Sequence, residues 1–206
     1  MSVFKDVKKV KKKVIALIAF VGVGLGLLAA LPATEVLHHF STNEFCASCH
    51  TMTPAVETFA KSIHGGQGGN NTTGFAAECV DCHLPKSNVV HELYVKGTSG
   101  MRHLWGEYVL GMEALDYEKL HPKRTEYVFD SGCLNCHRQL EDRAKIATEN
   151  SPVSDWTHKM AFERKASDSD WQCSSCHYDV AHPGLKHEMR NREEQKNREI
   201  ATMGAK

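Results

Sequence analysis

All eight cysteines of this 206-residue chain lie in one short pattern that occurs four times. Each copy has two cysteines separated by two residues and followed at once by a histidine, at residues 46–50, 79–83, 133–137 and 173–177. This pattern attaches c-type haem, because two thiols add to the vinyl groups of one porphyrin and the adjacent imidazole reaches the iron. The sequence therefore predicts four covalently bound haem c groups. The predicted tethers are Cys46, Cys49, Cys79, Cys82, Cys133, Cys136, Cys173 and Cys176, and the predicted proximal iron ligands are His50, His83, His137 and His177.

Two other kinds of site also use paired cysteines. Two groups of four cysteines could each bind zinc, and four disulfides could form outside the cytoplasm. Neither kind of site explains the histidine after each pair. With 13 histidines in 206 residues, four such histidines would follow by chance in roughly one chain in 10⁵. Haem attachment is therefore the preferred interpretation.

The composition agrees with a chain that folds around cofactors. Hydrophobic residues make up 41% of the chain and aromatic residues 8%, which is little for a large β-sheet enzyme. Four porphyrins would supply apolar surface that the side chains lack. We expect a mainly α-helical fold with extensive coil, a multihaem cytochrome c built around four haems. The formal net charge of zero gives no indication of binding to nucleic acid.

The N-terminus predicts one membrane-spanning helix. Residues 1–13 carry six lysines and one aspartate, and residues 14–31 contain no charged or strongly polar side chain. Eighteen helical residues rise about 27 Å, close to the thickness of the hydrocarbon core of a bilayer. Pro32 is expected to end the helix. A basic start is also typical of a cleaved signal peptide, but Leu31 and Pro32 disrupt the available cleavage frames, so we favour an uncleaved signal-anchor.

Lysine-rich flanks remain on the cytoplasmic side of a membrane, which gives the chain a direction across a bacterial inner membrane. We predict a cytoplasmic basic tip (1–13), a transmembrane signal-anchor helix (14–32), a periplasmic tetrahaem domain (33–184) and a charged C-terminal helix and tail (185–206). Beyond the basic tip, the chain carries 19 basic and 24 acidic residues. The Gly-rich segment 65–74 is expected to be a flexible loop.

Most low-spin haems take a second axial ligand, and the sequence offers four candidates. Met52 follows the first motif, and a methionine ligand would raise the potential of that haem relative to a haem with two histidines. His64, His158 and His182 lie outside the motifs. His182 is too close to His177 to reach the far side of the same iron, so a neighbouring haem is its expected partner. From the residues alone, each candidate could instead be a packing or solvated side chain.

Four segments of the chain carry a family resemblance. They read NEFCASCHTM (43–52), SIHGG (62–66), CVDCHLP (79–85) and CSSCHYDVAHP (173–183). With the lysine-rich tip and the N-terminal anchor, they resemble the NapC/NirT/NrfH family of membrane-anchored tetrahaem quinol dehydrogenases. The resemblance extends over residues 5–184. It implies that the protein oxidises quinol, with menaquinol as the expected form, and passes electrons to a periplasmic oxidoreductase such as a nitrate or nitrite reductase in anaerobic respiration.

The resemblance also implies roles for the candidate ligands. His64 would be the distal ligand of haem 4, and His182 that of haem 2. His158, in the sequence WTHKM, resembles the NapC-type ligand of haem 3, which favours NapC/NirT over NrfH, whose partner enzyme supplies a ligand. Haem 1 would be the unusual one, nearest to the quinol, with Met52 able to replace His50 on the iron.

The same resemblance points to a quinol site in the residues after the second motif. Relatives have an acidic residue in a Lys-Asp/Glu-aliphatic-Trp/Tyr-Gly element, but this chain reads Arg-His-Leu-Trp-Gly at 102–106, so His103 replaces the carboxylate. A basic family residue seven positions earlier corresponds to Lys96, on the same helical face. We predict that His103 accepts the quinol proton and that Lys96 orients the ring. The alternatives are that His103 ligates haem 1 or is a surface histidine.

Two other functions are compatible with the sequence. A member of the same family can work in reverse, passing electrons from a hydroxylamine-oxidising multihaem enzyme to the quinone pool. The chain could also be a plain electron-transfer or anchor subunit without a quinol site. In addition, the motif spacings of 33, 54 and 40 residues hint at a duplicated two-haem unit.

Overall fold

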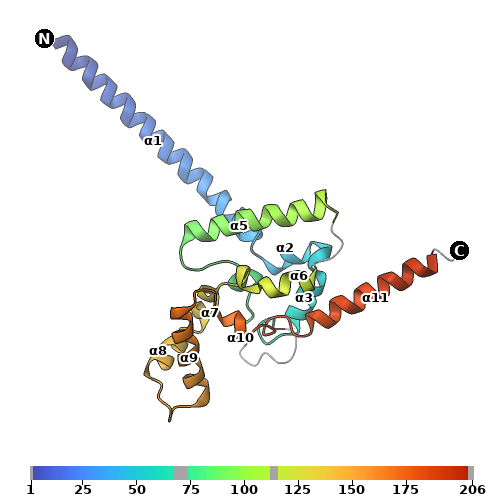
Figure 1. The fold of residues 1–206 in the computed structure, drawn as a ribbon. Coiled ribbons are helices and arrows are strands. Elements are labelled where there is room, and N and C mark those ends of the chain that lie inside the picture. Colours follow the sequence, from blue (N-terminus) through green and yellow to red (C-terminus); the bar gives the residue numbers. More distant parts are fainter. Residues whose placement is uncertain (1, 67–73, 112–115, 204–206) are drawn as a thin grey trace. The chain divides into compact units, whose positions relative to one another are not determined.

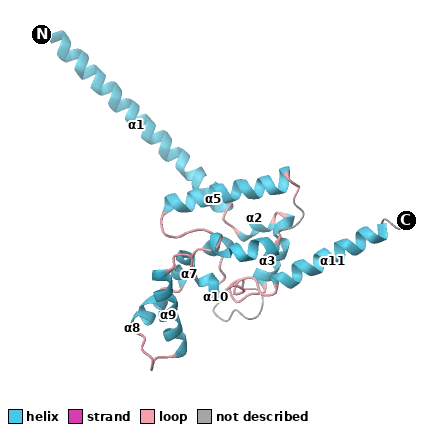
Figure 2. Cartoon of the chain, viewed as in Figure 1, coloured by secondary structure: helices cyan, strands magenta, loops and turns pink. Residues whose placement is uncertain are grey.

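The computed structural model of the protein describes residues 2–66, 74–111 and 116–203. Most of the predicted Gly-rich loop, residues 67–73, lies outside this part. The chain divides into two compact units, Met1–Ser41 and Thr42–Lys206. The regular elements are helical, and no strand occurs in the described residues (Figure 2). The prediction of a mainly helical fold with extensive coil is confirmed.

Short helices joined by coil make up most of the second unit (Figure 1). In chain order, the elements are α1 (Ser2–His39), α2 (Asn43–Ala47), η1 (His50–Met52), α3 (Thr53–Ala60), α4 (Cys79–His83), α5 (Val89–Leu104), η2 (Trp105–Val109), α6 (Tyr117–Leu120), η3 (His121–Glu126), α7 (Asp130–Cys136), α8 (Gln139–Ile146), α9 (Val153–Ser167), α10 (Cys173–Cys176) and α11 (Leu185–Met203). The elements η1 and η3 are 3₁₀-helical, and η2 is a π-helical turn.

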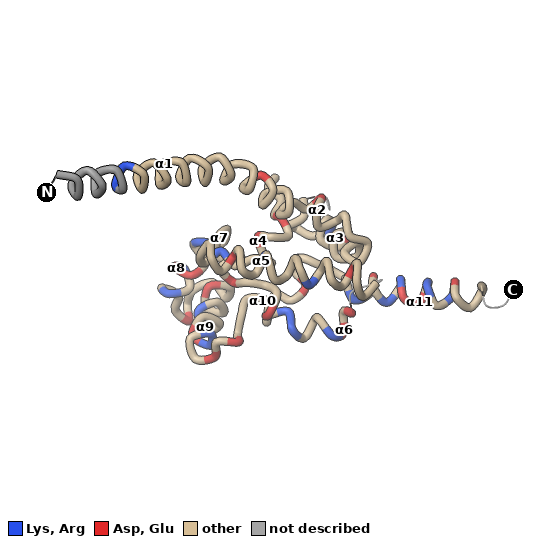
Figure 3. The backbone as a smooth tube through the Cα atoms, turned by 90° about the horizontal axis from the view of Figure 1, so that it is seen from above, with Lys and Arg blue, Asp and Glu red and all other residues tan. Residues whose placement is uncertain are grey.

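The first unit consists mainly of one long helix, α1. Its segment Lys12–His39 is long and apolar enough to cross a membrane by length and composition, and few charges interrupt it (Figure 3). The prediction that Pro32 ends the helix is wrong, because α1 continues through Pro32 to His39. Membrane helices tolerate proline because Ser and Thr side chains and local adjustments satisfy nearby backbone groups. The Thr34 hydroxyl donates to the Leu31 carbonyl at 2.7 Å in the turn that contains the proline, whereas the carbonyl that loses its helical donor at Pro32 is that of Leu28.

In the second unit, the cysteine motifs lie at the starts or ends of short helices. The helices α4 and α10 begin at their first motif cysteine, and α7 contains both cysteines of the third motif. Glu78 and Gln172 stand directly before the second and fourth motifs. Each forms a capping box with the residue three positions further on, which fixes where the helix begins. The second and fourth motifs therefore present their cysteines in the same local setting.

The apolar core of the second unit is small. Within the described residues, the buried hydrophobic side chains are Phe59, Ala77, Leu84, Ala144 and Ala147. Small domains bury a limited fraction of their surface even when the core is complete, and this core is made largely of alanine. The packing agrees with the expectation that haem groups supply apolar contact surface that the side chains lack.

The same kind of contact joins the first motif to the second and the third motif to the fourth. Asn43, three residues before the first motif, accepts a hydrogen bond from the Cys79 amide at 2.8 Å. Asp130, three residues before the third motif, accepts one from the Cys173 amide at 2.9 Å. In both halves, a polar side chain at the start of the odd-numbered motif helix therefore holds the first cysteine of the next motif. This equivalence supports the duplicated two-haem unit at which the motif spacings hint.

A different contact joins the two halves, where α4 packs against α7. The Phe129 amide donates to the Cys82 carbonyl at 2.9 Å. Gly132 stands directly before the third motif, and a Cβ atom added there would lie 1.9 Å from the Asp81 carbonyl oxygen. Two heavy atoms cannot approach so closely, so only glycine fits this backbone contact. The contacts between motifs one and two, two and three, and three and four place the four motifs in a continuous series.

Candidate functional site

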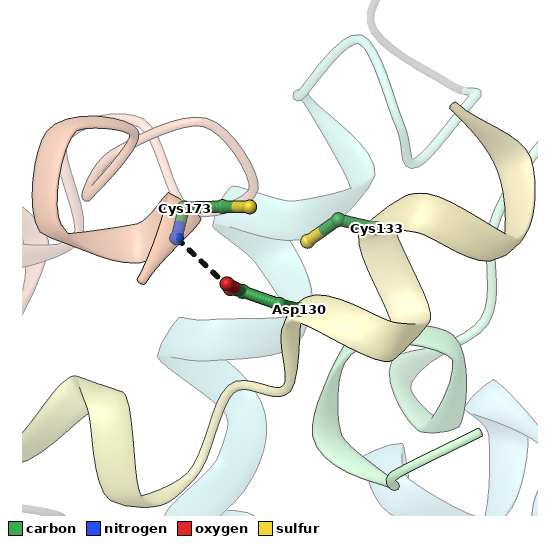
Figure 4. Close-up of side chains that lie close together, drawn as sticks. All are labelled: Asp130, Cys133 and Cys173. Atoms are coloured by element: carbon green, nitrogen blue, oxygen red, sulfur yellow. Dashed lines mark hydrogen bonds between the residues drawn. The ribbon is translucent and has the colours of Figure 1, made fainter. Parts of the chain in front are cut away.

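The first cysteines of paired motifs lie close together. A hydrogen bond from the Cys79 thiol lowers the pKa of Cys46 to about 7, and Cys173 has the same effect on Cys133. Figure 4 shows Cys133 and Cys173 pointing toward each other beside Asp130, whose carboxylate accepts from the Cys173 amide. The possible ligand atoms of these three residues lie within 4.8 Å of one another. Because both thiols belong to haem-attachment motifs, we interpret the cluster as a link between two such motifs and not as a separate metal site.

Three pairs of histidine rings lie close together in the second unit. Their ring centres are separated by 6.3 Å for His83 and His182, 6.4 Å for His64 and His137, and 6.1 Å for His158 and His177. Each pair combines one motif histidine with one of the predicted distal histidines. An iron bound to two imidazole nitrogens at about 2 Å each holds the ring centres roughly 6 Å apart. The observed separations fit that requirement.

The hydrogen bonds of three of these six rings also fit metal ligation. A ring N–H at Nδ1 can be donated from His83 to Tyr127, from His182 to Ala55 and from His158 to Ser154, at 2.8, 2.9 and 2.6 Å from the backbone carbonyl oxygens. Histidines that bind metals typically donate one ring N–H to such a partner and keep the other nitrogen for the metal. The carbonyl acceptors therefore select the tautomer in which Nε2 is available to an iron.

Of the three distal histidines, His182 is the one most strongly affected by burial and by hydrogen-bond partners. Burial lowers its pKa to about 4, so its ring is neutral at physiological pH, which is the form that a metal requires. The Thr58 hydroxyl lies 3.4 Å from the same Nδ1 atom that contacts the Ala55 carbonyl. The ring faces His83 of the second motif, which is the partner that the family resemblance implies.

The other two distal histidines face different motifs from those that the resemblance implies. His64 was expected to serve the fourth motif but lies beside His137 of the third. His158 was expected to serve the third motif but lies beside His177 of the fourth, with the two ring planes nearly parallel at 6°. The helices α8 and α9 pack side by side as a hairpin between these motifs (Figure 1). Because the hairpin turns back on itself, α9 brings His158 to the fourth motif.

The first motif is arranged differently from the other three. Its histidine, His50, contacts a carboxylate oxygen of Glu107 at 2.5 Å through Nδ1. The other carboxylate oxygen of Glu107 accepts a hydrogen bond from the Thr51 hydroxyl at 2.8 Å. Met52, the predicted alternative ligand, is half-buried at the end of η1. Glu107 was missed at the sequence level, although it directly follows the Arg-His-Leu-Trp-Gly element in which relatives carry an acidic residue.

The predicted quinol-site residues both lie on α5, near different motifs. Burial lowers the pKa of Lys96, and the charge of Lys96 acts on Cys46 of the first motif. The His103 side chain is exposed, yet desolvation by the surrounding protein lowers its pKa. The charge of His103 acts on His83 of the second motif. The structure thus places both residues along one helix beside the first two motifs.

Much of the surface of α5 and η2 is apolar and exposed. The exposed apolar side chains that form this apolar face are Val89, Val90, Leu93, Tyr94, Met101, Leu104, Trp105 and Tyr108. Near the C-terminal end of the face, an open pocket of about 350 Å³ is lined by Met101, Arg102, Trp105, Gly106 and Leu110. Within the described chain, the lining of this pocket does not include Lys96 or His103. Extended exposed apolar surface of this kind is typical of contact with a membrane or a partner.

Comparisons with known proteins agree with these features. The family described as "NapC/NirT cytochrome c family, N-terminal region" matches residues 8–187. Cytochrome c-type protein TorY of Escherichia coli O157:H7 is 31% identical over 181 residues, which cover 84% of this chain and 46% of TorY. Tetraheme c-type cytochrome CymA of Shewanella oneidensis is 26% identical over 182 residues, which cover 84% of this chain and 92% of CymA. The denitrification system component NirT of Stutzerimonas stutzeri is 31% identical over 174 residues, which cover 80% of each protein.

The extent of these matches differs among the relatives. The chain spans a little under half the length of the TorY proteins, but most of the length of CymA and NirT. No solved structure matches the chain significantly. The family match covers most of the chain and includes all four CxxCH motifs and most of the apolar N-terminal helix. The chain therefore belongs to the NapC/NirT cytochrome c family, whose members are membrane-anchored tetrahaem c-type cytochromes.

Proposed function

We propose that the protein is a quinol dehydrogenase that oxidises quinol, with menaquinol as the expected substrate, and supplies electrons to a periplasmic oxidoreductase. The observation that carries this proposal is the difference among the four motifs. Three motif histidines each face a second histidine ring, whereas His50 contacts Glu107. Glu107 lies in η2, which continues the exposed apolar face of α5. Three histidine-paired sites suit electron transfer, and a fourth beside an apolar surface suits reaction with a membrane substrate.

Four covalently attached haems are part of this proposal, and haem supplies one-electron transfer at each motif when it is bound. Three of the four sites have two histidine ligands in the proposed assignment. They are His83 with His182, His137 with His64, and His177 with His158. Bis-histidine ligation favours lower reduction potentials than histidine–methionine ligation, which suits acceptance of electrons from a low-potential quinol.

Quinol oxidation releases two protons with its two electrons, so the site needs a proton acceptor near neutral pH. His103 suits this role because its lowered pKa keeps the imidazole neutral and able to accept. Lys96 lies two helical turns before it and offers an ammonium donor to a quinol oxygen. Lys96 is partly desolvated, and this burial lowers its pKa. Hydrogen bonds from a partly desolvated donor are stronger than hydrogen bonds in water.

The first helix and the exposed apolar face of α5 support an arrangement at the membrane. The lysines of residues 1–13 favour a cytoplasmic N-terminus, which supports a periplasmic location for the second unit. That unit begins at Thr42, directly after a helix that is long enough to span the bilayer and ends at His39. The apolar face of α5 then provides a surface for the bilayer and its dissolved quinol.

The electron acceptor is proposed as a periplasmic enzyme such as a nitrate or nitrite reductase. The NirT relative is named as a denitrification system component, which agrees with this class of partner. Beyond the basic tip, the chain carries 19 basic and 24 acidic residues, and haem propionates add further negative charge. A partner with a basic docking surface would complement this charge.

Replacing His103 by alanine tests the quinol chemistry. If His103 accepts the proton, the rate of quinol oxidation should fall about 100-fold, while the optical and EPR spectra of the four haems stay unchanged. In the unaltered protein, the rate should fall as the pH drops through the lowered pKa of His103, below its ordinary value of 6.5, because protonated imidazole accepts no proton. Steady-state oxidation of a menaquinol analogue between pH 5 and 8 measures both effects.

Two other outcomes would contradict the proton-transfer role of His103. A new high-spin signal in the alanine variant would show instead that His103 ligates an iron. An unchanged rate with unchanged spectra would leave His103 as a surface histidine. Replacement of His187, an exposed histidine of α11, by alanine provides the matched control and should change neither rate nor spectra.

A further inference from the structure

The environment of Glu107 is unusual for a carboxylate near the protein surface. Its side chain is only 9% exposed, and each of its two oxygens has a protein partner. One oxygen contacts His50 Nδ1 at 2.5 Å, and the other accepts from the Thr51 hydroxyl at 2.8 Å. The residue stands in the π-helical turn η2, and such turns are found frequently at functional sites. A buried carboxylate whose two oxygens contact His50 and the adjacent Thr51 can fix the orientation of the His50 ring.

The His50 ring is held by the same atom as three of the other proposed ligand rings. In His83, His158 and His182, Nδ1 lies within hydrogen-bond distance of a backbone carbonyl oxygen. In His50, Nδ1 contacts a carboxylate oxygen instead. In both arrangements, Nδ1 carries the donated proton and Nε2 is left available to an iron. The difference lies in the acceptor, because a carboxylate forms a stronger hydrogen bond than a neutral carbonyl and raises the basicity of the imidazole as a ligand.

We propose that Glu107 is a positioning residue for the first haem. Its carboxylate holds His50 with Nε2 available, so that His50, and not Met52 or His103, is the axial ligand that the chain supplies at this motif. The same hydrogen bond makes His50 a more electron-donating ligand than His83, whose Nδ1 faces a neutral carbonyl, and it lowers the reduction potential of the first haem. This inference rests on the haem assignment of the proposed function and adds a regulator of potential at the proposed quinol-facing haem.

The test compares variants of the full-length, haem-loaded protein by redox titration followed optically and by EPR. We expect Glu107→Ala to shift the reduction equilibrium of a single haem at least tenfold toward the reduced form, which is about 59 mV for a one-electron couple. Glu107→Gln retains an uncharged oxygen acceptor, so it should keep His50 oriented and give a smaller shift in the same direction. The other three haems should keep their potentials. The matched control is Glu141→Gln, which removes the charge of an exposed glutamate that pairs with Lys145 at 2.9 Å.

A second variant separates the two candidate ligands of the first motif. Met52→Leu should leave the spin state and potential of every haem unchanged if His50 is the ligand. A change to high spin in Met52→Leu, or four unchanged potentials in Glu107→Ala, would overturn the inference. Quinol reduction of the unaltered protein is measured separately. Unchanged potentials in Glu107→Ala together with normal quinol reduction would reject only the role of Glu107. A shifted potential together with no reduction by quinol would reject only the proposed dehydrogenase function.

Discussion

Replacing His182 by alanine is expected to convert one haem in four from low spin to high spin. In the proposed assignment, His182 is the distal ligand opposite His83, and its ring is held by the Ala55 carbonyl and kept neutral by burial. Alanine supplies no ligand atom, so the second haem would lose one of its two nitrogen ligands. EPR and optical spectra of the oxidised, full-length protein measure the fraction of high-spin haem.

The loss should also interrupt function, because the second motif stands between the first and the third in the series of motif contacts. We expect quinol-driven reduction of the haems beyond the second to be lost or greatly slowed in the same variant. Added imidazole should restore the low-spin spectrum, because it can occupy the place of the missing ring. The matched control is His187→Ala, five residues further on, where the ring forms hydrogen bonds with the exposed Arg190 and Asn191 side chains. An unchanged spectrum in His182→Ala would contradict the assignment of this ring as a ligand.

Replacing Gly132 by alanine is expected to destabilise the junction of the two halves by about 3 kcal/mol or more, at the upper end of the usual cost of overpacking. The added Cβ would lie 1.9 Å from the Asp81 carbonyl oxygen and 3.4 Å from the Cys82 Cα atom. Both neighbours are backbone atoms of α4, so no side chain can rotate away to make room. The helix α4 or α7 must move, together with the hydrogen bond from the Phe129 amide to the Cys82 carbonyl. Chemical denaturation of the haem-loaded protein measures the change.

The chain offers a matched glycine for comparison. Gly100 lies in α5, and a Cβ atom there would meet nothing within 4 Å. Gly100→Ala should therefore stabilise the helix by up to about 1 kcal/mol, the ordinary gain of alanine over glycine in a helix. Wild-type stability in Gly132→Ala would contradict the close backbone contact between the second and third motifs. Lower stability in both variants would instead indicate a general sensitivity of the protein to substitution.

The sequence predicted those features that depend on residues close together in the chain. The four CxxCH motifs and the apolar run before Pro32 are local patterns with specific chemistry, and the structure and the family match agree with them. The helix end at Pro32 was predicted from the local cost of proline, but membrane-spanning helices tolerate that cost. The family resemblance identified the candidate distal ligands, but the spacing of residues in the sequence did not show which motif histidine lies opposite each one.

Features that depend on the path of the chain could not be predicted in this way. His158 was expected beside the third motif, and the α8–α9 hairpin brings it to the fourth instead. His103 stands where relatives carry a carboxylate, whereas Glu107, in the π-helical turn that follows, contacts His50. The contact between Gly132 and α4 joins segments about 50 residues apart. Each of these depends on a tertiary contact that no local pattern contains.

In the proposed function, electrons enter the haem series from quinol. The most direct test is to mix the purified, full-length protein in lipid vesicles with a reduced menaquinol analogue under anaerobic conditions and to follow the haem absorbance. Quinol is expected to reduce haem in the unaltered protein, and dithionite to reduce all four covalently bound haems of each chain. If quinol reduces no haem in a preparation whose four haems are all reduced by dithionite, the proposed function is contradicted.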